Sequence, residues 1–233
     1  MKKTTIIAII AILGVAVFWG ARMERKENNT LITIEKHNIA EENFSGSTVD
    51  IKGENSLAVA AKQFVDNEIA NFRERANLEV PDIRKQFGDM PPSHYTIDIT
   101  AEQLSGTRTE TILIQEYVYT GGANGMSIYK AFTVEKATGK ILALGYVIVS
   151  EKQDAFTQLV KDRLLAWKPE GMDSSPVFKD AVDKLSFSSF TNFGFKGDTF
   201  VLYFAKYDIG PGALGPVAFE IPVADLADYL SIY

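Results

Sequence analysis

The residue types that do most enzymatic chemistry are sparse in this sequence. Its two histidines, His37 and His94, stand in no HxxxH or HExxH pattern that would hold zinc. Cysteine is absent, which excludes a thiol nucleophile, a thiolate metal site and a disulfide. No Gly-x-Ser-x-Gly nucleophile elbow occurs. We therefore predict no catalytic residue, no metal ligand and no cofactor, although a serine triad assembled with His94 stays open.

The most distinctive local feature is the stretch YTGGANG, in which Gly121, Gly122 and Asn124 follow Tyr119. A phosphate-binding loop would lead into a helix and carry Gly-Lys-Ser/Thr, but a strand pattern follows here. Because glycine and asparagine tolerate positive φ, we interpret the stretch as a hairpin turn. Contact with a ligand is the alternative interpretation.

A second stretch rich in glycine and proline, YDIGPGALGPVAFEIP, begins at Tyr207 and Asp208. Its composition predicts a rigid, irregular connection that returns the chain to a sheet. The alternative is an exposed loop presented to a partner. If these two stretches bind a ligand, the residues expected to contact it are Tyr119, Gly121, Gly122, Asn124, Tyr207, Asp208 and Gly215.

Hydrophobic periodicity predicts the elements that carry these loops. Apolar residues three and four apart predict helices over Ser56–Leu78 and Ser150–Trp167, with shorter ones over Val177–Leu185 and Val223–Leu230. Alternation of period two predicts strands. These cover Tyr95–Ile99, Glu110–Tyr119, Ser127–Glu135, Asn192–Phe195, Thr199–Ala205 and Phe219–Pro222. Because helices are segregated from runs of strands, we predict an α+β fold, with antiparallel sheets packed against two or three amphipathic helices.

The N-terminus has the pattern of an export signal. Two lysines precede an uncharged apolar run, Thr4–Ala21, which would span about 27 Å as a helix. Cleavage after Ala21 would place Trp19 where signal peptidases need a small residue. We predict a retained single-pass anchor over residues 1–26, with the body outside the cytoplasm at the cell membrane. A cleaved signal that releases the body as a secreted protein is the alternative.

Charge is distributed unevenly along the chain. The first 26 residues carry a net charge of +4 and the remainder −10, which together make −6. An acidic body argues against nucleic acid, whose phosphates need lysine and arginine. It would suit a cationic partner, because opposite charge raises the association rate. Residues 27–55 are polar and are predicted to form a tether, which can include a first strand at Leu31–Glu35.

The order of these motifs resembles a known family. The order begins with YTGGAN, a strand and a Thr138-Gly139-Lys140 turn, and continues with an amphipathic helix, an aromatic hairpin, YDIGPGALGP and FEIPVADL. In this order, residues 121–233 resemble the DUF3298 domain. Residues 56–120 resemble, more distantly, a DUF4163 segment. The chain departs from the family at Asn124, where a histidine is common.

The resemblance implies a function in binding rather than in catalysis. DUF3298 domains are extracytoplasmic; one belongs to an anti-sigma factor that binds lysozyme, and another stands beside the catalytic domain of a peptidoglycan deacetylase. The resemblance therefore implies a cell-envelope binding module whose partner is a lysozyme-like cationic protein or peptidoglycan glycan. A small cell-envelope hydrolase, with carboxylates or His94 at a sheet edge, and a secreted structural protein are the alternatives.

Overall fold

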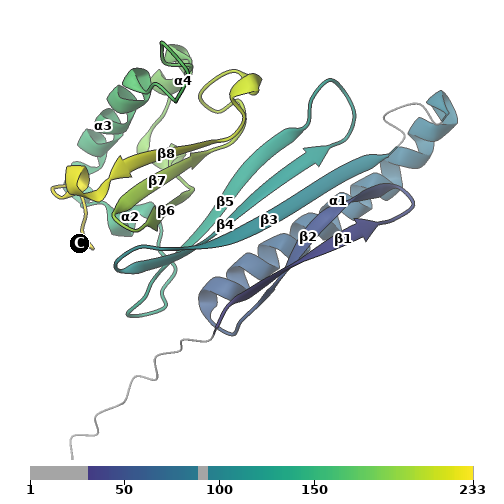
Figure 1. Ribbon diagram of the computed structural model, residues 1–233, viewed down its shortest axis with the longest axis horizontal. Helices are drawn as coiled ribbons and strands as arrows, with labels where there is room; N and C mark the ends of the chain where they lie inside the picture. Colours follow the sequence, from purple (N-terminus) through teal and green to yellow (C-terminus); the bar gives the residue numbers. More distant parts are fainter. Residues whose placement is uncertain (1–30, 89–93, 233) are drawn as a thin grey trace, which may run out of the picture.

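The computed structural model describes residues 31–88 and 94–232, which form two stacked sheets with helices on the outside (Figure 1). The predicted α+β class with mainly antiparallel strands is confirmed. The predicted anchor, Thr4–Ala21, lies outside the described residues. Within the described ranges, no helix has both the length and the apolar character needed to cross a membrane.

The large sheet has five strands in the order β1-β2-β3-β4-β5. Only β2 and β3 pair in parallel, so the chain must cross over between them, and helix α1 (Ser56–Phe87) makes that crossover. The strands are β1 (Thr33–Ala40), β2 (Phe44–Lys52), β3 (Tyr95–Ser105), β4 (Thr109–Tyr119) and β5 (Met126–Glu135).

The first strand expected at Leu31–Glu35 overlaps β1, but the predicted tether is wrong for the rest of residues 33–52, because β1 and β2 are strands of the large sheet. Their hydrophobic alternation is interrupted. In β2, Phe44 is buried at an even position, whereas Val49 and Ile51 are buried at odd positions. Gly46 lies between them with a φ of 143°, and a Cβ there would overlap the carbonyl group of Ile97. No single period-two pattern therefore runs through this strand.

Helix α1 covers one face of the large sheet. Its buried residues recur three or four apart and contact the inward side chains of β2, β3 and β4. The helix continues nine residues beyond the predicted end at Leu78, to Phe87, with Pro81 inside it. Side-chain hydrogen bonds support this last part, since Asn43 donates to Asn77 and Arg84 donates to Asn43.

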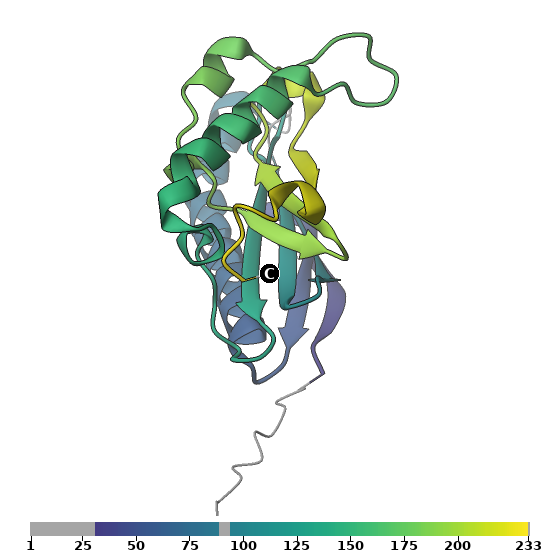
Figure 2. The same cartoon turned by 90° about the vertical axis from the view of Figure 1, so that its left-hand side faces the viewer.

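The small sheet is antiparallel, in the order β6-β7-β8, and its strands are β6 (Phe193–Lys196), β7 (Thr199–Phe204) and β8 (Val217–Pro222). Helix α3 (Gln153–Ala166) packs on its outer face (Figure 2). Phe156 of α3 is fully buried, and the Phe187, Phe190, Phe200 and Tyr229 rings surround it. The remaining short helices are α2 (Leu144–Val147), η1 (Ser150–Lys152), α4 (Lys179–Asp183), η2 (Phe187–Ser189), η3 (Gly212–Leu214) and η4 (Val223–Leu226). The closing helix predicted to reach Leu230 is only the single 3-10 turn η4.

The small sheet lies across one end of the large sheet, on the face away from α1 (Figure 1). Val201 and Tyr203 of β7 pack there against Leu104 and Leu113. Thr133 donates a hydrogen bond from its hydroxyl to the carbonyl oxygen of Phe193, at 2.7 Å. Beyond this contact zone, none of the described helices or strands covers the same face of β3, β4 and β5.

One acidic side chain is buried between α1 and the large sheet. Glu116 of β4 is 6% exposed, and its Oε2 has no hydrogen-bond partner among the described residues. Burial, with a further contribution from the charge of Glu68 on α1, raises the pKa of Glu116 to about 7. Because the folded pKa lies above the unfolded value, this group favours folding most at acidic pH. That contribution is lost as the pH rises through about 7.

We predict that Glu116→Gln raises the free energy of unfolding by about 1–3 kcal/mol at about pH 8, because a neutral amide removes the cost of burying the carboxylate. The gain becomes smaller toward about pH 5, where the wild-type side chain is already protonated in the folded state. Urea unfolding across this range measures the effect. Glu151→Gln, an exposed matched control, changes little at either pH. An equal gain for Glu116→Gln at both pH values would contradict the prediction.

Candidate functional site

The half of the large sheet that the small sheet leaves uncovered presents polar and aromatic side chains. Ile97, Ile99 and Ile114 face α1, so the residues that alternate with them face the other way. We call this surface the open face. It consists of Thr96, Asp98, Thr100 and Glu102 on β3, Gln115, Tyr117 and Tyr119 on β4, and Ser127 and Tyr129 on β5.

Strand register arranges these side chains in rows. Tyr117, which is 38% exposed, lies between Asp98 on β3 and Ser127 on β5. Opposed side chains in such pairs lie about 5 Å apart, so all three can contact one ligand. Ser47 of β2 extends the row, because its Oγ donates a hydrogen bond of 2.7 Å to Asp98 Oδ1. Asp98 is thereby fixed in orientation.

The next row marks the border with the small sheet. Gln115 lies between Thr100 and Tyr129, and the Tyr129 ring contacts Tyr203 of β7 with centroids 5.3 Å apart. Burial raises the pKa of Tyr129, and the charge of Glu102 adds to the shift. The Tyr129 hydroxyl therefore stays protonated at neutral pH and can donate a hydrogen bond.

The β4–β5 loop is the hairpin turn that the sequence predicted, because β4 and β5 pair antiparallel on either side of it. Gly121 and Gly122 have φ values of 100° and 94°, in the region that favours glycine. Tyr119 donates a hydrogen bond from its hydroxyl to the Gly122 carbonyl oxygen at 3.0 Å. Asn124 is exposed at the tip of the loop.

The β7–β8 connection is held in a strained conformation. Tyr207 is the one non-glycine residue with positive φ in the described part of the chain, at 76°. The residue is 51% exposed, and its ring covers Gly212 so closely that a Cβ on this glycine would overlap it. Asp208 Oδ2 accepts a 2.7 Å hydrogen bond from the Ala205 amide, and Gly215 has a φ of 72°. Strain of this kind is concentrated at functional sites in proteins.

Lys206 joins the two glycine-rich loops. Its amide donates to the Ser127 carbonyl oxygen at 2.9 Å, and its Nζ donates to the Gly125 carbonyl oxygen at 2.7 Å. The ammonium also lies 5.1 Å from the centre of the Tyr207 ring. Both loops thus lie at one border of the open face, at the top of Figure 1.

The structure divides the predicted contact residues into two groups. Tyr119, Asn124 and Tyr207 present side chains at this border, whereas the glycines and Asp208 shape the backbone of the loops. Sequence reasoning did not single out Tyr117, Gln115 or Asp98. Their alternation within strands is visible in the sequence, but their juxtaposition depends on pairing between distant strands.

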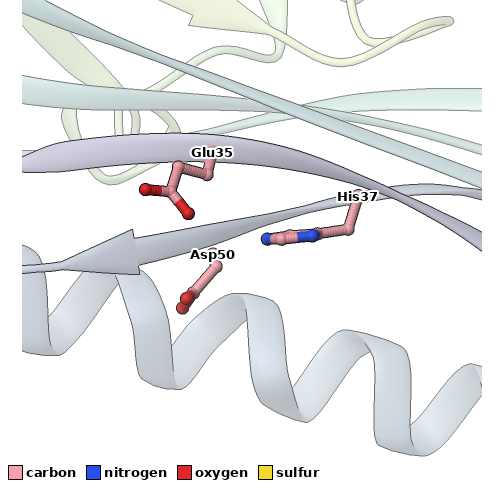
Figure 3. A group of neighbouring side chains, drawn as sticks. All are labelled: Glu35, His37 and Asp50. Carbon is pink, nitrogen blue, oxygen red and sulfur yellow. The ribbon is translucent and has the colours of Figure 1, made fainter.

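A second group of charged side chains lies at the opposite edge of the sheet (Figure 3). Glu35, His37 and Asp50 bring one ligand atom each within 4.8 Å of one another. Lys52 already supplies a cation there, with its Nζ 2.7 Å from Glu35 Oε2 and 3.7 Å from Asp50 Oδ2. The hydrogen bond from Lys52 lowers the pKa of Glu35. Because a metal ion would have to displace Lys52, we interpret this group as an exposed ion-pair network.

Part of the chain matches a known protein family. The family model described as "Protein of unknown function (DUF3298)" matches residues 146–224. This segment contains α3, the small sheet and the β7–β8 connection. A DUF3298 domain therefore occupies this part of the chain, within the predicted range of residues 121–233; the YTGGAN stretch lies outside the matched residues.

One curated relative is a peptidoglycan-N-acetylmuramic acid deacetylase, PdaC, from Bacillus subtilis (strain 168). The two sequences are 24% identical over 240 residues, an alignment that covers 97% of this chain and 49% of PdaC. The chain thus spans about half the length of this relative.

Two solved structures share the fold. A DUF3298 family member from Bacteroides fragilis has a TM-score of 0.60 at 17% identity, over 88% of this chain and 95% of that one. A DUF3298 family protein from Pseudomonas aeruginosa PAO1 has a TM-score of 0.54 at 16% identity, over 87% and 94% of the two chains. The likeness extends over most of the described residues, so both layers belong to the shared fold.

We predict that Gly125→Ala lowers the free energy of unfolding by about 1 kcal/mol, because the added Cβ would overlap the Tyr117 ring. In a Tyr117→Ala background, the same substitution has little effect, since the ring is gone. A double-mutant cycle from urea unfolding measures this coupling. An equal loss in both backgrounds would contradict contact between the loop and Tyr117.

Proposed function

We propose that this chain is an extracytoplasmic binding module of the bacterial cell envelope and that its open face recognises cell-wall glycan. The observation that carries the proposal is the row in which Tyr117 lies between Asp98 and Ser127. Pyranose rings have apolar C–H faces that stack on aromatic rings. Their hydroxyl rims exchange hydrogen bonds with carboxylates, amides and hydroxyls. The open face offers both kinds of contact on one surface.

The rigidity of the open face supports this function. Its side chains stand on paired strands backed by α1, so few backbone torsions need to be ordered on binding. Tyrosine has only two side-chain torsions and therefore provides contact area at low entropic cost. From Thr96 to Glu102 the strand extends about 20 Å, which is room for several sugar rings.

The comparisons support a role at the cell wall. PdaC is named for an activity on peptidoglycan, and a segment similar to this chain makes up about half of it. In our proposal the shared segment binds the wall and brings a neighbouring activity to it. The DUF4163-like segment over residues 56–120 contributes α1, β3 and β4 to the same module, and Thr4–Ala21 anchors it in the membrane unless it is cleaved.

A lysozyme-like cationic protein is the second candidate ligand, and the net charge of −10 beyond the first 26 residues favours it. The two ligands differ in their response to salt. Binding of a cationic protein would weaken strongly with ionic strength, because it depends on long-range attraction. Binding of a neutral N-acetylated glycan by stacking and hydrogen bonds would change little.

We predict that Tyr117→Ala weakens the binding of a neutral N-acetylglucosamine tetramer about tenfold, the loss expected for one aromatic stacking contact. Calorimetry on the full chain in detergent measures the affinity. Tyr146→Ala is the matched control, because Tyr146 is 58% exposed on α2, outside the open face, and its loss leaves the affinity unchanged.

Two outcomes would contradict this function. Equal losses in the two tyrosine variants would remove the open face as the binding surface. Salt-sensitive binding of lysozyme, with no binding of the tetramer, would instead assign the module to a cationic protein.

A further inference from the structure

The open face carries two carboxylates without a cationic partner. Asp98 is half-buried and Glu102 is exposed, and both stand on β3. Among the described residues, no lysine or arginine nitrogen lies within salt-bridge distance of either one. Asp98 Oδ1 accepts from Ser47, and this leaves Oδ2 available to a ligand. Many other surface carboxylates are paired, for example Glu41 with Arg73 at 2.9 Å.

The negative charge of Glu102 shifts the pKa of neighbouring side chains. After burial, the charge of Glu102 is the next cause that raises the pKa of Tyr129 and of Tyr203. Lys206, at the border of the open face, directs its ammonium to the Gly125 carbonyl oxygen. The Asp98 and Glu102 charges are therefore left to act on whatever binds here.

We propose that the open face selects glycans whose amino sugars carry a free ammonium group instead of an N-acetyl group. This inference rests on the proposed function and names the class of glycan. An ammonium placed over the row can donate to Asp98 Oδ2 in a charge-assisted hydrogen bond. Tyr117 is the register partner of Asp98 on the neighbouring strand, and its ring can attract the same cation through a π face. An N-acetyl group is neutral and loses both interactions.

The chemistry of the ligand indicates the reaction that supplies it. Hydrolysis of an N-acetyl group consumes water, breaks the amide bond and leaves acetate and a free amine. Deacetylation is the reaction class named for the relative PdaC. A module that binds the free amine would hold its protein on wall that has already been deacetylated.

The test compares two tetramers that differ only in acetylation, a glucosamine tetramer and an N-acetylglucosamine tetramer. Calorimetry on the full chain at about pH 6 and about 50 mM salt keeps the amines protonated and the screening low. We expect the glucosamine tetramer to bind about five- to tenfold more tightly. Asp98→Asn brings the ratio of the two affinities close to one. Asp173→Asn makes the same change in net charge at an exposed loop position, and it keeps the ratio.

The outcomes separate this inference from the function on which it rests. Equal affinity for the two tetramers, with both weakened by Tyr117→Ala, would overturn the selectivity and leave glycan binding intact. No binding of either tetramer would overturn both. A preference for the glucosamine tetramer that survives in Asp98→Asn and Glu102→Gln, or equally tight binding of tetralysine, would show that the preference comes from the diffuse acidic charge of the body. Either result would overturn the inference.

Discussion

Strand β4 is packed on both faces over one half of its length and on one face over the other half. From Thr111 to Ile114 every residue is buried, because α1 covers one side and the small sheet covers the other. From Gln115 to Tyr119 the described elements cover only the α1 side, and Tyr117 is 38% exposed. A continuous strand therefore links the packed core rigidly to the open face. Two threonine hydroxyl groups hold the small sheet at the point where β4 changes from two covered faces to one. Thr111 and Thr133 share a hydrogen bond of 2.9 Å, and Thr133 donates to the carbonyl oxygen of Phe193.

The same contact determines the position of the second glycine-rich loop. Gly194 of β6 lies directly against Thr111, where a Cβ would come within 3.0 Å of its side chain. With β6 held there, β7 leaves the contact zone toward the open end of β5, and Lys206 reaches Ser127 and Gly125. Two stretches that are about 85 residues apart in sequence thus border one surface.

Local patterns in the sequence were sufficient for much of this fold. Alternation and the Gly-Gly-Ala-Asn turn predicted the β4–β5 hairpin, and the motif order predicted the DUF3298 domain that matches over residues 146–224. Other features depend on non-local contacts. Polar composition predicts a tether over residues 27–55 with a first strand at Leu31–Glu35, whereas residues 33–52 contain two strands of the large sheet. The alternation of β2 is interrupted at Gly46, so it gives no period-two pattern in the sequence. The open face was not predicted, because the pairing of Tyr117 with Asp98 is a matter of strand register, and register is set by the whole sheet.

Ligand recognition on the open face is tested most directly by hydroxyl-radical footprinting of the full chain, read by mass spectrometry, with and without solubilised peptidoglycan fragments. Tyr117 and Tyr207 are both exposed and border the same surface, so we expect their oxidation to fall as glycan is added. Tyr146, which is more exposed than either and lies on α2, keeps its reactivity. Unchanged oxidation of Tyr117 at saturating glycan, with protection at Tyr146 or on α1, would contradict recognition by the open face.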